Sequence, residues 1–216
     1  MSNSSTLHPD FKGFNSNDFA TFSIDGLDER MQAIQERIQP KFKAIGEALC
    51  DEIAMQAGTE MYLHIAKHAR RTVNPPKDTW LAVAANKRGY KQHPHFQVGL
   101  FDDHVFLWFA LIYELPDKQA IAERFLANKQ ALFDSIPEGY VFSFDHTQKK
   151  SFSSDEISLE SFGASLVRLR DVKKAEFLVG RHLSSSDPIL TDGEAFLTLA
   201  KETFHTLMPF YRTARG

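Results

Sequence analysis

The apolar run from Val105 to Tyr113 constrains the fold more than any other segment of the chain. It is nine residues long, far short of the roughly 20 that a helix needs to cross a bilayer. Because no polar side chain interrupts it, neither of its faces can lie in water. We therefore predict a central strand that is covered on both sides.

The segments before this run predict its neighbours in the sheet. Residues 80–84 and 96–101 read as strands, and Phe96, Val98 and Leu100 alternate with polar or small residues. Their connections to each other and to residues 104–113 are too short for helical crossovers, so the three strands must pair antiparallel. Further strands are predicted at residues 21–24, 61–66, 140–144 and 175–183.

Helical spacing of apolar residues separates these strands. A helix is predicted over residues 27–38, a second begins at Pro40 and stops at Gly58, and a third runs from Pro116 to just before Pro137. A fourth covers residues 159–169, and Thr191 with Glu194 predicts a capping box for a closing helix. An antiparallel sheet with helices packed mainly on one face is an α+β fold.

Composition fits one ordinary soluble domain. The chain has 216 residues, 43% hydrophobic, and its 19 Phe predict a core packed with rings. We expect a flexible tail over residues 1–10 and a single α+β domain over residues 11–216. The first ten residues carry no apolar signal core, and a single cysteine, Cys50, cannot form an internal disulfide. These features predict a cytoplasmic protein without a membrane association.

Residues 67–95 are the one segment with marked chemical character. Seven cations stand there against a single acid, Asp78, which is a local excess of six positive charges in a chain of formal net charge −3. Arginine side chains in such a cluster can hold phosphate groups bidentately, and aromatic rings can stack on a base or sugar. The candidate ligand-binding residues are Lys67, Arg70, Arg71, Trp80, Lys87, Arg88, Tyr90, Lys91 and His95. The alternative is a solvated surface balanced by acids elsewhere.

Six segments resemble the YktB-like proteins of low-GC Gram-positive bacteria. They are Gly26–Met31, His64–Trp80, Asn86–Lys91, Pro94–Leu100, Ala110–Glu114 and Lys173–Glu176. The resemblance implies a family of unknown function, with a compact α+β fold grouped with TATA-binding-protein-like and helix-grip architectures. It supplies no catalytic residue. Relatives with these architectures bind either nucleic acid on the sheet or a small ligand beneath a long helix, so the fold alone does not choose between these uses.

The leading hypothesis is a non-catalytic protein that binds a phosphate-bearing ligand, either nucleic acid or a nucleotide-like molecule. One alternative is an apolar pocket between the sheet and the helix that follows Thr191. Another is a hydrolase or phosphoesterase centred on His93, His95 and His104, for which the H-x-H spacing is a weak signal. No cofactor motif is present, and we expect neither a cofactor nor a metal. Cys50 is expected to be a core residue, and the oligomeric state is not predicted.

Overall fold

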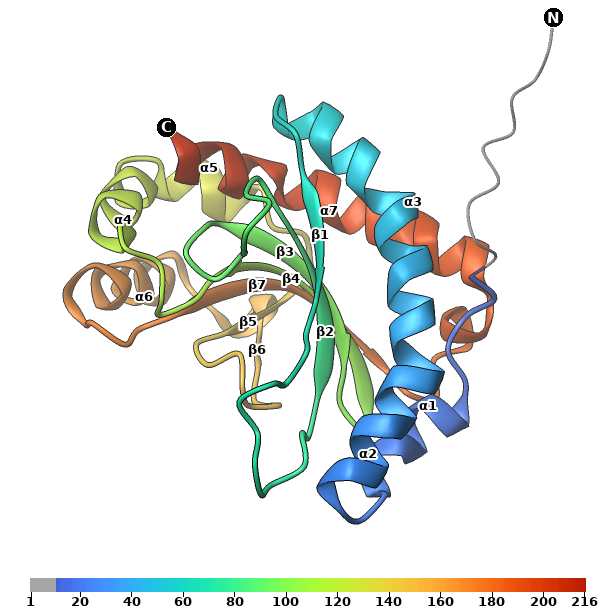
Figure 1. Ribbon diagram of the computed structural model, residues 1–216. Coiled ribbons are helices and arrows are strands. Elements are labelled where there is room, and N and C mark those ends of the chain that lie inside the picture. Colours follow the sequence, from blue (N-terminus) through green and yellow to red (C-terminus); the bar gives the residue numbers. More distant parts are fainter. Residues whose placement is uncertain (1–10) are drawn as a thin grey trace, which may run out of the picture.

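The computed structural model describes residues 11–216, and it confirms an α+β fold with an antiparallel sheet (Figure 1). The predicted tail over residues 1–10 lies outside the described residues. Seven strands form one sheet in the order β1-β2-β3-β4-β7-β5-β6, and every neighbouring pair is antiparallel. The strands are β1 (Tyr62–Ile65), β2 (Thr79–Ala84), β3 (His95–Leu100), β4 (His104–Leu111), β5 (Val141–Ser143), β6 (Phe152–Ser153) and β7 (Phe177–Ser184).

Strand β4 is central and covered on both faces, as its sequence predicts. All eight of its residues are buried. Alternate side chains, including Leu107 and Phe109, enter the large core beneath the helices. Phe106, Trp108 and Ala110 point to the opposite face and form a smaller apolar cluster there. Each face of the sheet therefore needs its own cover.

The helices supply the cover on the first face. They are α1 (Ser16–Ala20), α2 (Leu27–Ala33), α3 (Gln39–Ala57), α4 (Lys118–Ala127), α5 (Lys129–Asp134), α6 (Leu159–Asp171) and α7 (Gly193–Arg215), with short 3-10 turns η1 (Thr21–Ser23), η3 (Ser154–Glu156) and η4 (Pro188–Thr191). A π-helical turn, η2 (Ile34–Ile38), joins α2 to α3. Pro40 lies in the first turn of α3, and Gly58 ends that helix with a φ of 65°. Both features confirm the prediction.

The helix predicted from Pro116 to just before Pro137 is divided at Asn128 into α4 and α5. Two further local predictions are wrong. Residues 21–24 do not form a strand: Thr21–Ser23 continues α1 as a 3-10 turn, and the Thr21 hydroxyl donates to the carbonyl of Asn17. The cap of α7 is Asp192, not Thr191. The Asp192 carboxylate accepts hydrogen bonds from the backbone amides of Glu194 and Ala195, whereas the Thr191 hydroxyl donates to the carbonyl of Pro188.

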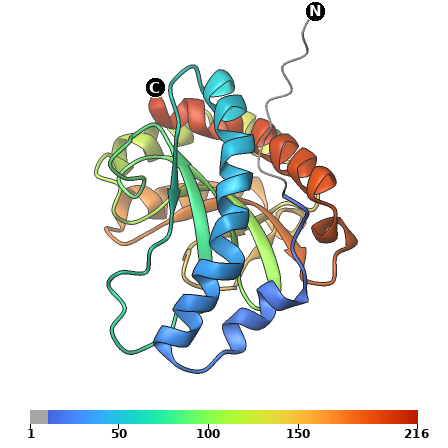
Figure 2. The ribbon, with the colours of Figure 1, turned by 45° about the vertical axis from the view of Figure 1, so that its right-hand side comes forward.

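Helix α7 crosses the sheet and packs on β4 and β7, while α3 covers β1 and β2 (Figures 1 and 2). Aromatic rings fill the space beneath α7. Phe96 of β3 lies 5.0 Å from Phe204 and 5.4 Å from Tyr211, and Phe177 of β7 lies 6.0 Å from Phe210, between ring centroids. The predicted abundance of rings in the core is thus explained by solid packing. The rings of α7 and the sheet are in direct contact at these positions, and both an apolar ligand pocket between the sheet and α7 and the likeness to helix-grip architecture stay predictions.

Within the part of the chain that the structure describes, none of the helices covers the second face of the sheet, which we call the loop face. Its side chains come from alternate strand positions, such as Trp80, Ala82, His95, Gln97 and Trp108. The loops at residues 66–78, 85–94, 112–117 and 144–151 provide groups that contact them. Loops leave polar backbone and side chains near the sheet, so this face is where polar chemistry can gather.

We expect Gly180→Ala to destabilise the fold strongly. A Cβ at Gly180 of β7 would meet the backbone carbonyl of Leu107 and the ring of Trp108. Forcing these apart in the middle of the sheet should lower the free energy of unfolding by about 2 kcal/mol or more. The matched control is Gly89→Ala, since a Cβ at Gly89 meets nothing within 4 Å. Urea unfolding of both variants measures the effect, and equal stabilities would show that β4 and β7 are packed less closely than described.

Candidate functional site

The basic residues fall into two groups at opposite ends of β2. Lys67, Arg70, Arg71 and Lys77 lie in the loop 66–78, which extends below the sheet in Figure 1. Lys87, Arg88 and Lys91 lie in the loop 85–94 that leads from β2 to β3. At about 3.3 Å per residue, the six residues of β2 separate the loops by roughly 20 Å. The cations therefore do not meet at one point.

Six of these seven cations are exposed and, within residues 11–216, form no ion pair. They are Lys67, Arg70, Arg71, Lys77, Lys87 and Arg88. Lys91 differs, because its ammonium lies 3.2 Å from the carboxylate of Glu114. Among the described residues, a neighbouring acid therefore neutralises only Lys91 of the seven cations. The other six can contact a ligand.

The two loops are linked across the loop face by aromatic and imidazole groups. The indole N–H of Trp80 donates to the Tyr90 hydroxyl at 2.9 Å. The His68 ring meets Trp80 edge-on at 5.5 Å, and its Nε2 lies 3.1 Å from the hydroxyl of Thr79. His68 holds a φ of 49°, an uncommon backbone conformation for a residue with a side chain. These contacts fix the loop 66–78 against the strand that follows it.

Two of the predicted ligand-binding residues are inside the protein. His95 has no exposed surface: its Nδ1 lies 2.7 Å from the carbonyl of His93, and its Nε2 lies 2.8 Å from the side-chain nitrogen of Gln97. Burial lowers the pKa of His95 to about 3, so the ring is neutral. Tyr90 is buried against His95, with ring centroids 4.9 Å apart. Neither ring is free to contact a ligand in this arrangement.

The three histidines proposed for a hydrolase do not share a site. His95 begins β3 and pairs with Ala110, whereas His104 lies at the other end of the β3–β4 hairpin, with its Nδ1 2.6 Å from Asp103. The ring of His182, not that of His95, lies next to His104, at 4.2 Å. Cys50 offers no nucleophile either, because burial raises the pKa of its thiol to about 11.

A different histidine occupies the polar centre of the loop face. His146 follows β5, and its Nδ1 lies 2.9 Å from both carboxylate oxygens of Glu176. Its ring stacks near Tyr113 at 6.5 Å and meets Trp80 edge-on at 6.1 Å. Burial by itself would lower the pKa of His146, but the Glu176 carboxylate, together with Asp78 and Asp145, raises it.

Glu176 is 4% exposed and ties two loops to the start of β7. It accepts hydrogen bonds from the backbone amides of Tyr113 and His146, at 3.2 and 2.8 Å. Lys118 fixes the turn just before it by donating to the carbonyls of Val172, Lys173 and Ala175. Donor atoms of Asp145, His146 and Glu176 all lie within 4.8 Å of one another, so these three residues could hold a metal ion.

Asp78 is the second buried acid of the loop face, with 6% of its surface exposed. It lies directly before β2, and within residues 11–216 its carboxylate accepts no hydrogen bond from another residue. Burial raises its pKa to about 6, although the nearby charges of His146 and Arg71 act in the opposite direction. A buried carboxylate whose pKa is raised in this way is typical of functional sites.

Sequence reasoning did not identify Tyr113, His146 or Glu176 as site residues. His146 and Glu176 lie 30 positions apart, and no motif connects them. The only available signal was the isolated position of His146 and Asp145 in a polar loop after a predicted strand. Tyr113 is 47% exposed and offers the stacking surface that Tyr90 does not.

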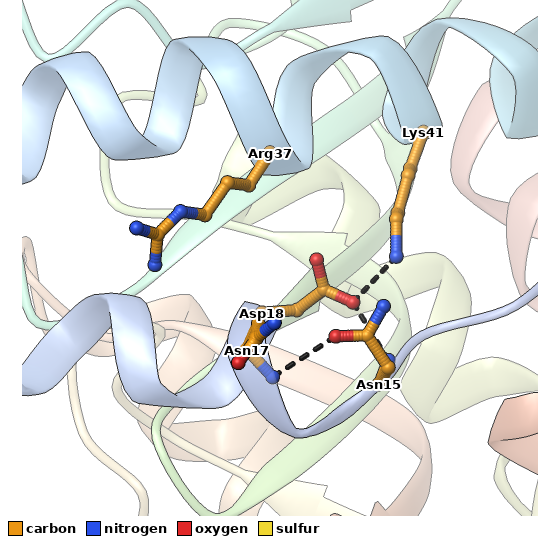
Figure 3. A pocket seen from close by; sticks show the side chains of 5 residues that line it. All are labelled: Asn15, Asn17, Asp18, Arg37 and Lys41. Atoms are coloured by element: carbon orange, nitrogen blue, oxygen red, sulfur yellow. Dashed lines mark hydrogen bonds and ion pairs between the residues drawn. The ribbon is translucent and has the colours of Figure 1, made fainter.

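A separate pocket of about 380 Å³ lies between α1 and the helical segment η2–α3 (Figure 3). Asn15, Asn17, Asp18, Arg37 and Lys41 line it. The Lys41 ammonium lies 2.6 Å from the Asp18 carboxylate and also donates to the carbonyl of Gly13, whereas the exposed Arg37 extends from the π-helical turn into the space between the two elements. No motif in the sequence predicts this pocket. Its one ion pair already joins the two elements, which indicates a structural contact.

We expect Asp78→Asn to stabilise the protein at pH 8 and to change little at pH 4. The ordinary pKa of 3.8 applies to the unfolded chain, and the folded value is about 6. The folded state therefore holds this proton more tightly, and stability falls as pH rises from about 4 to 6. The gain at pH 8 should be on the order of 2 kcal/mol. Urea unfolding at both pH values, with the exposed Asp51→Asn as control, measures it; destabilisation at pH 8 would reveal a stabilising partner of the carboxylate.

Comparison with known proteins places these features in a family. Residues 14–211 match the family model described as a domain of unknown function, DUF1054. The chain is 56% identical to a UPF0637 protein of Oceanobacillus iheyensis, over 94% of this chain and 96% of the relative. It is also 56% identical to a UPF0637 protein of Shouchella clausii, over 93% of each, and 49% identical to one of Listeria welshimeri, over 94% and 98%. The resemblance to YktB-like proteins is thus confirmed, and the chain belongs to the uncharacterised DUF1054/UPF0637 family.

Proposed function

We propose that this protein is a non-catalytic binding protein that holds a phosphate-bearing ligand through the loops 66–78 and 85–94. The observation that supports this proposal most directly is the set of six exposed cations in these loops without ion-pair partners among residues 11–216. Residues 67–95 carry six excess positive charges while the rest of the chain carries −9, so the positive potential is local to these loops.

The distance between the loops favours nucleic acid over a nucleotide-like molecule. A ligand that reaches both groups of cations must span roughly 20 Å, which is longer than a mononucleotide. A nucleic-acid strand presents a phosphate at each step and can reach both loops at once. The arginines Arg70, Arg71 and Arg88 are the residues best suited to clasp its phosphates, because each guanidinium can donate two parallel hydrogen bonds.

Aromatic groups near the basic loops suit an unpaired strand. Tyr113 is exposed, and Trp80 is half-buried between the two loops. Base stacking on such rings tolerates any sequence, because every base has a flat face. The protein is therefore expected to bind single strands with little sequence preference.

None of the helices in residues 11–216 combines the length and apolar character that a bilayer-crossing segment needs.

We expect the triple variant Arg70→Glu, Arg71→Glu, Arg88→Glu to lose binding to a labelled single-stranded oligonucleotide. For the unmodified chain, the logarithm of affinity should fall linearly with the logarithm of salt concentration. Loss of three phosphate contacts should reduce that slope by about 2. Fluorescence anisotropy over a salt series provides both quantities, with a mononucleotide as competitor to test the small-ligand alternative.

The matched control reverses the same number of charges on the helical side, at Lys43, Arg168 and Lys201. These side chains lie on α3, α6 and α7, away from both loops. The control variant has the same net charge and should keep most of the affinity. Binding that is absent in the unmodified chain, independent of salt, or equally weak in both triple variants would contradict the proposal.

A further inference from the structure

We propose that Asp145, His146 and Glu176 form a binding site for one divalent transition-metal ion. The donor atoms of these residues lie within 4.8 Å of one another, close enough to contact a single ion. One imidazole and two carboxylates are ligands that Zn²⁺ and Mn²⁺ accept, whereas Cu⁺ prefers sulfur and Ca²⁺ prefers oxygen alone. This inference departs from the sequence analysis, which expected no metal, and it does not depend on the proposed binding of phosphates.

The two carboxylates are already held in place by hydrogen bonds outside the donor set. Backbone amides of Tyr113 and His146 orient Glu176, and each comes from a different loop. One oxygen of Asp145 accepts from the amide and hydroxyl of Thr147, at 2.9 and 2.7 Å. Its second oxygen forms no hydrogen bond within residues 11–216. Supporting hydrogen bonds of this kind orient the ligands of metal sites in proteins.

Asp78 provides an independent reason to expect a cation here. It is 6% exposed, its carboxylate accepts a hydrogen bond from its own backbone amide, and it lies two positions before Trp80, whose ring is 6.1 Å from that of His146. The charges of Glu176, Asp78 and Asp145 all act on the His146 imidazole, and the carboxylates of Glu176 and Asp78 are almost completely buried. Excess negative charge in a buried site favours a bound cation, because unpaired buried charges are costly.

Purified full-length protein, stripped with a chelator and dialysed, should bind one Zn²⁺ per chain in isothermal titration calorimetry. Mn²⁺ should bind at the same place, lose its free-ion electron paramagnetic resonance signal and quench the fluorescence of Trp80 through its unpaired electrons. His146→Gln and Asp145→Asn should each weaken affinity by about tenfold or more. Asp145 is exposed, so its replacement tests the site without removing a buried contact.

The matched control is His104→Gln, because His104 also contacts a carboxylate, that of Asp103, but lies outside the donor set. It should leave the affinity for both ions unchanged. Glu176 also ties two loops together, so Glu176→Gln is informative only if circular dichroism shows that the chain still folds. His146→Gln and Asp145→Asn test the metal site without this variant. Absence of binding by the unmodified chain, unchanged affinity in both variants, or an equal loss in His104→Gln would overturn the proposal.

Discussion

Burial of β4 on both faces is the constraint on which the rest of the structure depends. An apolar strand without a wet side cannot lie at an edge or on an open sheet, so both layers around it must be built. The chain builds one layer from α3, α4, α6 and α7 and the other from loops. Helices can cover a sheet with apolar side chains alone. Loops cannot, because their backbone amides and carbonyls need partners.

That difference explains why charged and polar groups gather on one side only. On the helical face, Phe rings meet other rings and leave no polar atom to satisfy. On the loop face, Glu176 serves the amides of two loops, and the carbonyl of His93 and the side chain of Gln97 occupy both nitrogens of His95. Asp78 differs, since only its own backbone amide donates to its carboxylate, and among the described residues His104 Nε2 and Glu114 Oε2 are buried with no hydrogen-bond partner. The basic loops then surround this polar centre with exposed cations.

Much of the architecture follows from short-range patterns in the sequence. The central position of β4, the antiparallel order of β2, β3 and β4, the proline at the start of α3 and the glycine at its end are all local signals. The errors also have local causes. Thr21 and Phe22 are residue types that favour strands, but they continue the helical turn of α1. At the start of α7, Asp192 takes the backbone amides that the predicted Thr191 cap would have bound.

The candidate site was less predictable, because its groups meet only through tertiary packing. The charge excess in residues 67–95 is visible in the sequence, yet its division between two ends of β2 depends on the pairing of β1, β2 and β3. The pairing of His146 with Glu176 depends on β5 lying next to β7, an association of strands that are not consecutive. The local charge excess could be read from the sequence as an attraction for anions. The buried acids near these loops could be identified only in the folded chain.

The lengths of the outermost strands have a consequence for behaviour at high concentration. The sheet ends in β1, with four residues, and β6, with two, while β5 pairs with only Leu178, Val179 and Gly180 of β7 and leaves the remainder of that strand without a neighbour on this side within residues 11–216. Short margins of this kind give a second copy little to pair with, which disfavours the growth of intermolecular sheets. The apolar middle strand is thus kept away from the margins, where a second copy could add to the sheet.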